Sequence, residues 1–169
     1  AELLNKAIKL KVIGRAGIGD DNIDLAAASR KGIVVMNTPF GNAITTAEHT
    51  IAMIFAAARK IPAANQALQS GIWDKKSFIG MELFGKKLGI VGVGNIGSIV
   101  SSLAQSLGMK IIAYDPFLSE EQTSKLGAKK VKLEELLSEA DFITLHTPFT
   151  NETKGILNKE SLKKCKPGV

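Results

Sequence analysis

The chain has 169 residues, of which 45% are hydrophobic and 22% charged, an ordinary balance for a globular protein. It contains no apolar run near the roughly 18–20 residues that cross a bilayer, and its single cysteine excludes an internal disulfide. The net charge of +6 raises the possibility of nucleic-acid binding, but the lysines are scattered and aromatic residues make up only 5% of the chain. We therefore expect no nucleic acid and no membrane as partner. The lysines are expected to lie mainly on solvated faces, and attraction of a small anionic substrate is the alternative role of the positive charge.

Short apolar runs alternate along the chain with helical patterns, which is typical of a parallel sheet covered by helices. The N-terminus lacks the basic and apolar segments of a signal peptide, which favours a cytoplasmic protein. In the first half, strands are expected at residues 10–14 and 33–36, and helices at 23–29, 45–59 and 63–68. The helix at 45–59 is apolar almost all round, which indicates burial between layers or at an interface. Residues 70–84 have little periodicity and are expected to connect this part to the next sheet.

The second half has the clearer pattern. Strands are expected at residues 88–91, 111–114 and 142–145, and helices at 96–107, 119–126, 133–140 and 159–165, the last with Asn158 as N-cap. The final residues, Pro167-Gly168-Val169, look like the turn before another strand. We therefore expect an α/β fold with a doubly wound parallel sheet that is truncated at the C-terminus.

A glycine motif, Gly92-Val93-Gly94-Asn95-Ile96-Gly97, follows the strand at 88–91 and opens the next helix. Asp115 ends the following strand, 18 residues after Gly97, close to the spacing of about 20 in Rossmann dinucleotide sites. Gly92 permits a tight turn, Gly94 lets a pyrophosphate approach the backbone, and Gly97 allows close packing of the helix. A carboxylate at Asp115 accepts hydrogen bonds from ribose hydroxyls and repels a 2′-phosphate. The sequence therefore predicts NAD, rather than NADP, as cofactor.

Two further loops follow predicted strands. His146-Thr147-Pro148 ends the strand at 142–145, which places Thr147 and Pro148 beside the cofactor; His146 itself is either a catalytic base or a hydrogen-bonded edge residue. The other loop, at residues 15–19, either binds an anion through Arg15 and its backbone N–H groups or is an exposed turn.

Other polar or unusual residues are given structural roles. Asp20, Asp21, Asn22 and Asp24 lack the glycine and glutamate of a calcium loop and are expected to cap a helix. Trp73 is expected to be a packing or interface anchor and Cys165 an inert core thiol, and no metal site is expected.

Taken together, the motifs resemble those of the NAD-dependent D-2-hydroxyacid dehydrogenases over essentially the whole chain. They are the segments 12–19, 21–24, 32–39, 46–49, 92–97, 114–116 (Tyr114-Asp115-Pro116) and 145–148. The first of these segments narrows the resemblance toward members that oxidise 3-phospho-D-glycerate. Ile18 lies where some relatives have a threonine, and Asp20 stands where the family often has an apolar residue.

This resemblance implies the oxidation of 3-phospho-D-glycerate to 3-phosphohydroxypyruvate with transfer of hydride to NAD, a step of serine biosynthesis. It places Gly92, Gly94, Asn95, Ile96 and Gly97 at the pyrophosphate, Tyr114, Asp115 and Pro116 near the ribose, and His146, Thr147 and Pro148 along the cofactor. Arg15, Ala16 and Gly17 would bind the substrate.

The resemblance also implies a domain division and an assembly. Residues 1–40 would be the end of the substrate domain and residues 41–169 an incomplete NAD-binding Rossmann domain, and the protein would be a homodimer or homotetramer. The family's catalytic arginine, glutamate and histidine would lie beyond Val169, so no catalytic residue is expected within the chain and the fragment alone would be inactive. Two alternatives stay open, namely a dehydrogenase for glycerate or another D-2-hydroxy acid, and a non-catalytic NAD-sensing protein of the same fold.

Overall fold

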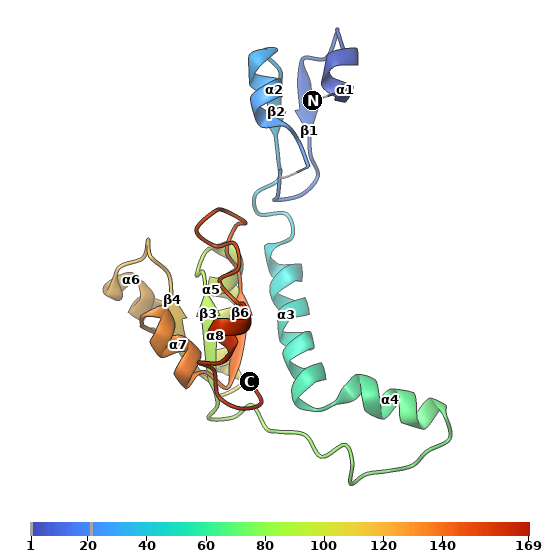
Figure 1. The fold of residues 1–169 in the computed structure, drawn as a ribbon, viewed down its shortest axis with the longest axis vertical. Helices are drawn as coiled ribbons and strands as arrows, with labels where there is room; N and C mark the ends of the chain where they lie inside the picture. The colour runs from blue at the N-terminus through green and yellow to red at the C-terminus, as the bar shows by residue number, and fades with distance from the viewer. Residues whose placement is uncertain (1, 21) are drawn as a thin grey trace. The chain divides into compact units, whose positions relative to one another are not determined.

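The computed structural model describes residues 2–20 and 22–169, which divide into two compact units (Figure 1). The first unit is Ala1–Ala43 and the second is Ile44–Val169. Among the described residues, no helix is both long enough and apolar enough to span a membrane.

The first unit contains a two-stranded parallel sheet and two short helices. Its elements are α1 (Glu2–Lys6), β1 (Val12–Gly14), α2 (Leu25–Arg30) and β2 (Val34–Met36). A small core joins Leu4 to Ala27, Ala28 and Ile33. The side chain of Asp24 accepts a hydrogen bond of 2.8 Å from the Ala27 N–H and thereby caps α2, as predicted. The corresponding expectation for Asp21 lies outside the described residues.

The second unit begins with two helices and continues into a four-stranded sheet. Helices α3 (Ala43–Ala58) and α4 (Ile61–Gln69) match the predictions, and residues 70–84 contain neither helix nor strand. The sheet consists of β3 (Lys87–Val91), β4 (Lys110–Tyr114), β5 (Ala128–Lys130) and β6 (Phe142–Leu145), and the connecting helices are α5 (Asn95–Ser106), α6 (Glu120–Lys125) and α7 (Leu133–Glu139). All neighbouring strands are parallel, in the order β5-β4-β3-β6.

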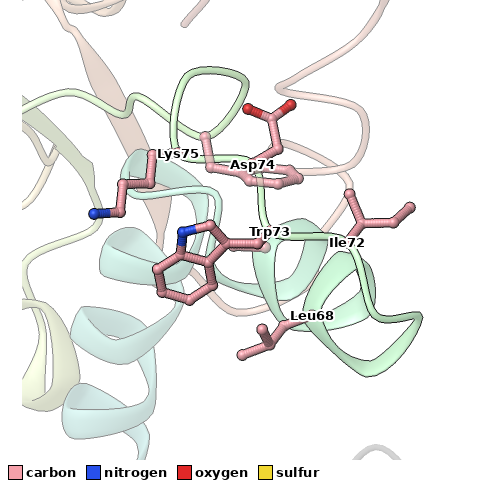
Figure 2. Close-up of a pocket in the computed structure, with 7 residues that line it drawn as sticks. Leu68, Ile72, Trp73, Asp74 and Lys75 are labelled. Atoms are coloured by element: carbon pink, nitrogen blue, oxygen red, sulfur yellow. The ribbon is translucent and has the colours of Figure 1, made fainter.

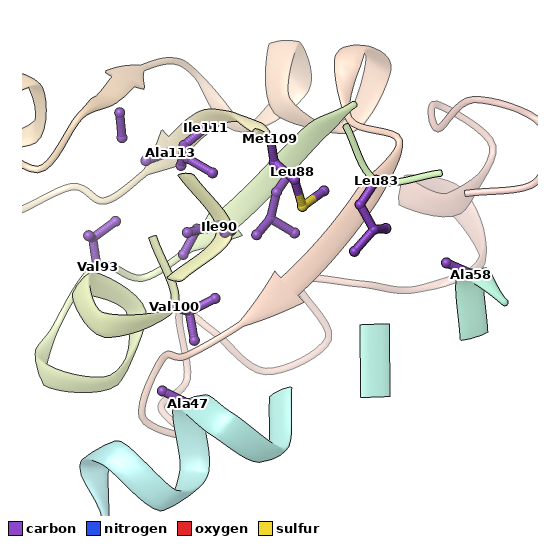
Figure 3. Close-up of a cluster of buried hydrophobic side chains, with 12 residues drawn as sticks. Ala47, Ala58, Leu83, Leu88, Ile90, Val93, Val100, Met109, Ile111 and Ala113 are labelled. Carbon is purple, nitrogen blue, oxygen red and sulfur yellow. The ribbon is translucent and has the colours of Figure 1, made fainter. Parts of the chain in front are cut away.

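Helices cover both faces of this sheet because alternate residues of the central strands point to opposite sides. Leu88 and Ile90 of β3 pack with Val100 of α5 on one face, as Figure 3 shows, and Ala47 of α3 belongs to the same cluster. On the other face, Val91 packs in a cluster with residues of β4 and α7. The predicted α/β fold with a doubly wound parallel sheet is therefore confirmed.

Helix α7 packs so closely on β3 that only a glycine fits at the contact between them. A Cβ built on Gly89 would lie 2.7 Å from Leu136 Cδ2 and 3.0 Å from Ala140 Cβ. Leu136 is fully buried as a result, and it is one of the residues that hold α7 on the sheet.

Two details differ from the prediction. Strand β5 is absent from the prediction because its sequence, Ala-Lys-Lys, has no apolar run. It lies at the edge of the sheet, where only one of its three residues is buried. Helix α8 (Lys159–Leu162) ends three residues earlier than predicted, although Asn158 caps it as expected through hydrogen bonds from Glu160 N and Ser161 N. Cys165 therefore follows the helix, half-buried, with its Sγ 3.5 Å from the Ser161 carbonyl oxygen.

Candidate functional site

The strand order reverses at one point of the sheet, between β3 and β6. The chain runs from β3 outward to β4 and β5, and then returns to place β6 on the other side of β3. Ligands of such sheets bind outside the carboxyl ends of the strands at this crossover. A cleft of about 580 Å³ lies there, lined by Gly92, Gly94, Tyr114, Asp115, Pro116, Phe117, His146, Thr147, Pro148, Thr150, Glu152, Thr153 and Ile156.

The first turn of the glycine loop is fixed by close contacts with the loop after β6. Gly92 has φ of +89°, a conformation that favours glycine, and its N–H donates to the Tyr114 carbonyl at 2.9 Å. A Cβ at Gly92 would lie 2.8 Å from Thr147 Cγ2 and 2.9 Å from the His146 carbonyl oxygen. The fold itself therefore requires glycine at this position.

Gly97 is required for a different reason, namely the approach of α5 to the loop. A Cβ there would overlap the carbonyl oxygen of Gly92 and would lie 3.2 Å from its carbonyl carbon and 3.4 Å from Ile90 Cγ2. The absence of a side chain at Gly97 brings the first turn of α5, which includes Asn95 and Ile96, directly against the glycine loop. The predicted packing role of this glycine agrees with the geometry.

No such protein contact explains Gly94. A Cβ built there would meet no atom within 4 Å, although Gly94 lines the cleft and is the N-cap of α5. It has no side chain to cap the helix. Helices α4 and α7 also lack a side-chain cap, whereas α2, α6 and α8 are each capped by the side chain of their N-cap residue. A helix N-terminus without a side-chain cap offers N–H groups and the positive end of its dipole to an anion. The open space at Gly94 thus fits the pyrophosphate of a dinucleotide.

Asp115 joins the glycine loop to the loop after β4. Its Oδ2 accepts a hydrogen bond of 2.9 Å from Val93 N, and its Oδ1 accepts one of 2.9 Å from Phe117 N. Both carboxylate oxygens therefore have a backbone donor, and each retains a lone pair that can accept a hydrogen bond from a second donor. Because Asp115 also lines the cleft, it can accept ribose hydroxyls there.

On the opposite wall, the loop after β6 begins with a histidine whose partner lies in its own strand. His146 N donates to the Val91 carbonyl at 2.8 Å, and its Nε2 lies 2.9 Å from Thr144 Oγ1. Burial lowers the pKa of His146 below its usual value of 6.5. Burial therefore favours the neutral form of this imidazole, which is hydrogen-bonded at the edge of the cleft, next to Thr147 and Pro148.

The sequence analysis missed the rest of this wall. Thr153 Oγ1 donates to the Pro148 carbonyl at 2.6 Å and accepts a hydrogen bond of 2.8 Å from Thr150 N. A hydrogen bond from the Thr150 side chain lowers the pKa of Glu152. The signal available in the sequence was the pair of threonines three residues apart, which is typical of a tight polar turn. Phe117 and Ile156, which complete the lining, had no such signal.

The predicted substrate residues belong to the first unit, whereas the cleft belongs to the second. The N–H of Arg15 donates to the Met36 carbonyl at 2.8 Å, and that of Gly17 donates to the Arg15 carbonyl at 3.0 Å. The Arg15 guanidinium folds over Gly17, since a Cβ at Gly17 would lie 2.8 Å from Arg15 Cζ. Ala16, between them, is exposed. In the described part of the chain, no group of three His, Cys, Asp or Glu side chains is arranged to hold a metal ion.

Comparison with known proteins shows which family has this sequence and fold. Residues 51–169 match the family described as D-isomer specific 2-hydroxyacid dehydrogenase, NAD binding domain. The chain is 51% identical over 168 residues to D-3-phosphoglycerate dehydrogenase of Bacillus subtilis, covering 99% of this chain and 32% of the relative. It is 52% identical over 166 residues to that of a Synechocystis strain, covering 98% of this chain and 30% of the relative. The chain thus spans about a third of the length of these curated relatives.

A solved structure with the same fold contains the cofactor. D-lactate dehydrogenase from Aquifex aeolicus, complexed with NAD and lactic acid, is 35% identical, with a TM-score of 0.87 over 99% of this chain and 50% of that one. The resemblance, the Rossmann fold and the NAD cofactor are thereby confirmed. The chain belongs to the D-isomer-specific 2-hydroxyacid dehydrogenase family, and it carries that family's NAD-binding domain.

Proposed function

We propose that the chain is the central part of an oxidoreductase that converts 3-phospho-D-glycerate to 3-phosphohydroxypyruvate. The observation that carries this proposal is the extent of the similarity, because about half of the residues are identical to D-3-phosphoglycerate dehydrogenases across both units. Such an enzyme would act in serine biosynthesis, in the cytoplasm. NAD, when bound, accepts the hydride that leaves C2 of the substrate.

Within the cleft, each wall has a separate part in holding the cofactor. The first-turn N–H groups of α5, at Asn95 and Ile96, would donate to the pyrophosphate, for which Gly94 leaves room. Asp115 would accept the hydroxyls of the adenosine ribose through its remaining lone pairs. Among the described residues, the cleft lining includes two carboxylates, Asp115 and Glu152, and no lysine or arginine, which favours NAD over a cofactor with an additional phosphate.

In the first unit, the loop after β1 is the proposed substrate site. Residues 1–40 would then be the end of the substrate domain, and residues 41–169 the incomplete NAD-binding domain. The guanidinium of Arg15 would attract the doubly negative phosphoglycerate, and the backbone N–H groups of Ala16 and Gly17 would donate to its carboxylate. For Gly17 this requires sharing the hydrogen bond that its N–H makes with the Arg15 carbonyl.

Substrate oxidation by the intact protein tests the proposal. We expect NADH formation, followed at 340 nm, with 3-phospho-D-glycerate and much less with D-glycerate or D-lactate, and we expect Arg15→Gln to raise the KM for the phosphorylated substrate most. A preference for D-glycerate would instead support the alternative that the protein is a dehydrogenase for glycerate or another D-2-hydroxy acid. Binding of NADH without turnover of any 2-hydroxy acid would support an NAD sensor. Appreciable turnover by the 169-residue chain alone would contradict the placement of the catalytic groups outside it.

We also propose that the protein is a homo-oligomer that uses the surface of α4 and the loop after it. Trp73 is 74% exposed, and with Leu68, Ile72 and Phe78 it lines a shallow apolar pocket of about 310 Å³. Figure 2 shows the indole ring beside Leu68 and Lys75, whose Nζ lies 5.4 Å from the ring centroid. An exposed group of apolar side chains of this kind is typical of a protein interface.

Sedimentation of the intact protein tests this interface. Trp73→Arg places a charge in the pocket and should shift the protein toward a smaller species. Phe149→Arg, at another exposed aromatic residue on the loop after β6, is the matched control and should leave the distribution unchanged. An unchanged oligomer in Trp73→Arg would refute this use of the α4 surface.

A further inference from the structure

The carboxylate of Asp115 accepts two hydrogen bonds from the protein backbone, apart from any contact with ribose. It accepts one hydrogen bond from the loop after β3, at Val93 N, and one from the loop after β4, at Phe117 N, both at 2.9 Å. Val93 is only 4% exposed, so its N–H has little access to water as an alternative partner. The two loops that form this side of the cleft are therefore held together through a single side chain.

The peptide N–H that Asp115 accepts lies in the middle of the glycine motif. Val93 stands between Gly92, whose N–H is held by the Tyr114 carbonyl, and Gly94, the uncapped N-cap of α5. Fixing the N–H of Val93 fixes the peptide plane between Gly92 and Val93, one peptide before Gly94 and the start of α5. The orientation of the phosphate-binding turn thus depends on a carboxylate on the neighbouring strand.

We propose that Asp115 is a positioning residue for the phosphate-binding turn, in addition to its contact with ribose. This inference rests on the proposed cofactor site in the cleft. A carboxylate suits the task because all of its hydrogen-bonding positions are acceptors, whereas an amide must turn its NH₂ group toward one of the two backbone donors. Replacing Asp115 by asparagine therefore loosens one of the two loops as well as weakening the ribose contact.

The two roles predict opposite results for a ligand that has phosphates and no ribose. If Asp115 contacts only ribose, then removing its negative charge leaves the binding of such an anion unchanged or strengthens it, because repulsion in the cleft is reduced. If Asp115 also positions the turn, then the same substitution weakens the binding of the anion despite the lost repulsion. Inorganic pyrophosphate is the suitable probe.

The experiment measures the inhibition constant of pyrophosphate against NADH, whose fluorescence reports its binding to the intact protein, at constant ionic strength. We expect Asp115→Asn to raise this constant about tenfold, in line with the loss of one charge-assisted hydrogen bond. Asp115→Ser, whose hydroxyl likewise accepts at most one of the two N–H groups, should give an increase at least as large and serves if the amide variant does not fold.

Asp141→Asn is the matched control, since Oδ2 of Asp141 accepts a hydrogen bond of 2.8 Å from the N–H of Lys87, at the opposite end of β3. It should leave the pyrophosphate constant unchanged while removing an equivalent charge. Hydrogen exchange of a peptide covering residues 92–100, without ligand, should be faster in Asp115→Asn and unchanged in the control. An unchanged or lower pyrophosphate constant in Asp115→Asn would overturn the positioning role, whereas failure of the unmodified protein to bind NADH would overturn the cofactor site itself.

Discussion

Gly97→Ala tests how closely α5 must approach the glycine loop. The added Cβ would lie 3.2 Å from the Gly92 carbonyl carbon and closer still to its oxygen, and 3.4 Å from Ile90 Cγ2. The loop cannot retreat, because Gly92 already packs tightly against Thr147 and His146. The helix must therefore move outward by on the order of 1 Å to restore ordinary contact distances.

The free energy of unfolding should fall as a result. Overpacking of this kind costs about 1–3 kcal/mol, and the better helix propensity of alanine returns at most about 1 kcal/mol. We expect Gly97→Ala to lose about 1–2 kcal/mol of stability and to bind NADH at least about tenfold more weakly, since the displaced N–H groups no longer meet the phosphates.

Gly94→Ser is the informative partner, because it should separate binding from stability. A serine at this N-cap meets no protein atom within 4 Å, and its hydroxyl can accept the N–H groups of the first turn. Stability should stay unchanged or rise by up to about 1 kcal/mol, while NADH affinity falls, because the hydroxyl occupies the donors that the pyrophosphate needs.

Urea unfolding and NADH fluorescence titration of both variants in the intact protein measure the two quantities. A Gly97→Ala variant that is as stable as the parent and binds NADH equally well would contradict the close approach of α5 to the glycine loop. Unchanged NADH affinity in Gly94→Ser would show that the open space at Gly94 has no connection with the cofactor.

Three further predictions follow from burial and charge. The His146 imidazole should titrate by NMR below its usual pKa of 6.5, because burial disfavours its charged form, and a midpoint at or above 6.5 would contradict its placement. Burial raises the pKa of Asp141, but hydrogen bonds from Lys166 Nζ and Lys87 N outweigh burial and lower it. The stability lost in Asp141→Asn should therefore be constant above about pH 5 and should shrink as the pH falls through that lowered pKa, which urea unfolding at several pH values would show. Leu136→Ala should cost about 2–5 kcal/mol in the same assay with little change in NADH affinity, since it opens a cavity beneath α7 on the face of the sheet across from α5.

The sequence predicted those parts of the fold and site that rest on local patterns. The glycine motif, the strand before it and Asp115 after the next strand lie within 30 residues, and their spacing alone indicates the turn, the helix and the acceptor. The sequence did not predict strand β5, because an edge strand needs no apolar run. Its lysines are typical of an edge that is protected from pairing with another strand.

Tertiary contacts explain what else the sequence could not show. The hydrogen bond from Val93 N to Asp115 spans 22 residues and depends on the register of β3 with β4, which no local pattern records. Phe117 and Ile156 line the cleft only because the carboxyl ends of β4 and β6 flank that of β3. Trp73, expected as a packing or interface anchor, is largely exposed, so an interface with another chain is the role that stays a prediction.

The two ends of β3 show how the same strand serves stability and binding separately. At its amino end, Lys87 pairs with Glu139 at 2.6 Å, and Asp141 accepts both the Lys87 N–H and the Lys166 ammonium, so these charges have partners within the chain. At its carboxyl end, the glycine motif leaves the first turn of α5 without a side-chain cap, a state that costs stability until an anion binds. Because the first set of groups is already satisfied and the second is not, substitutions at the amino end should change the free energy of unfolding and leave NADH affinity intact. A side-chain cap introduced at Gly94 should lower NADH affinity without lowering the free energy of unfolding. The uncapped N-terminus of α5 is therefore the feature that makes this end of the sheet a cofactor site.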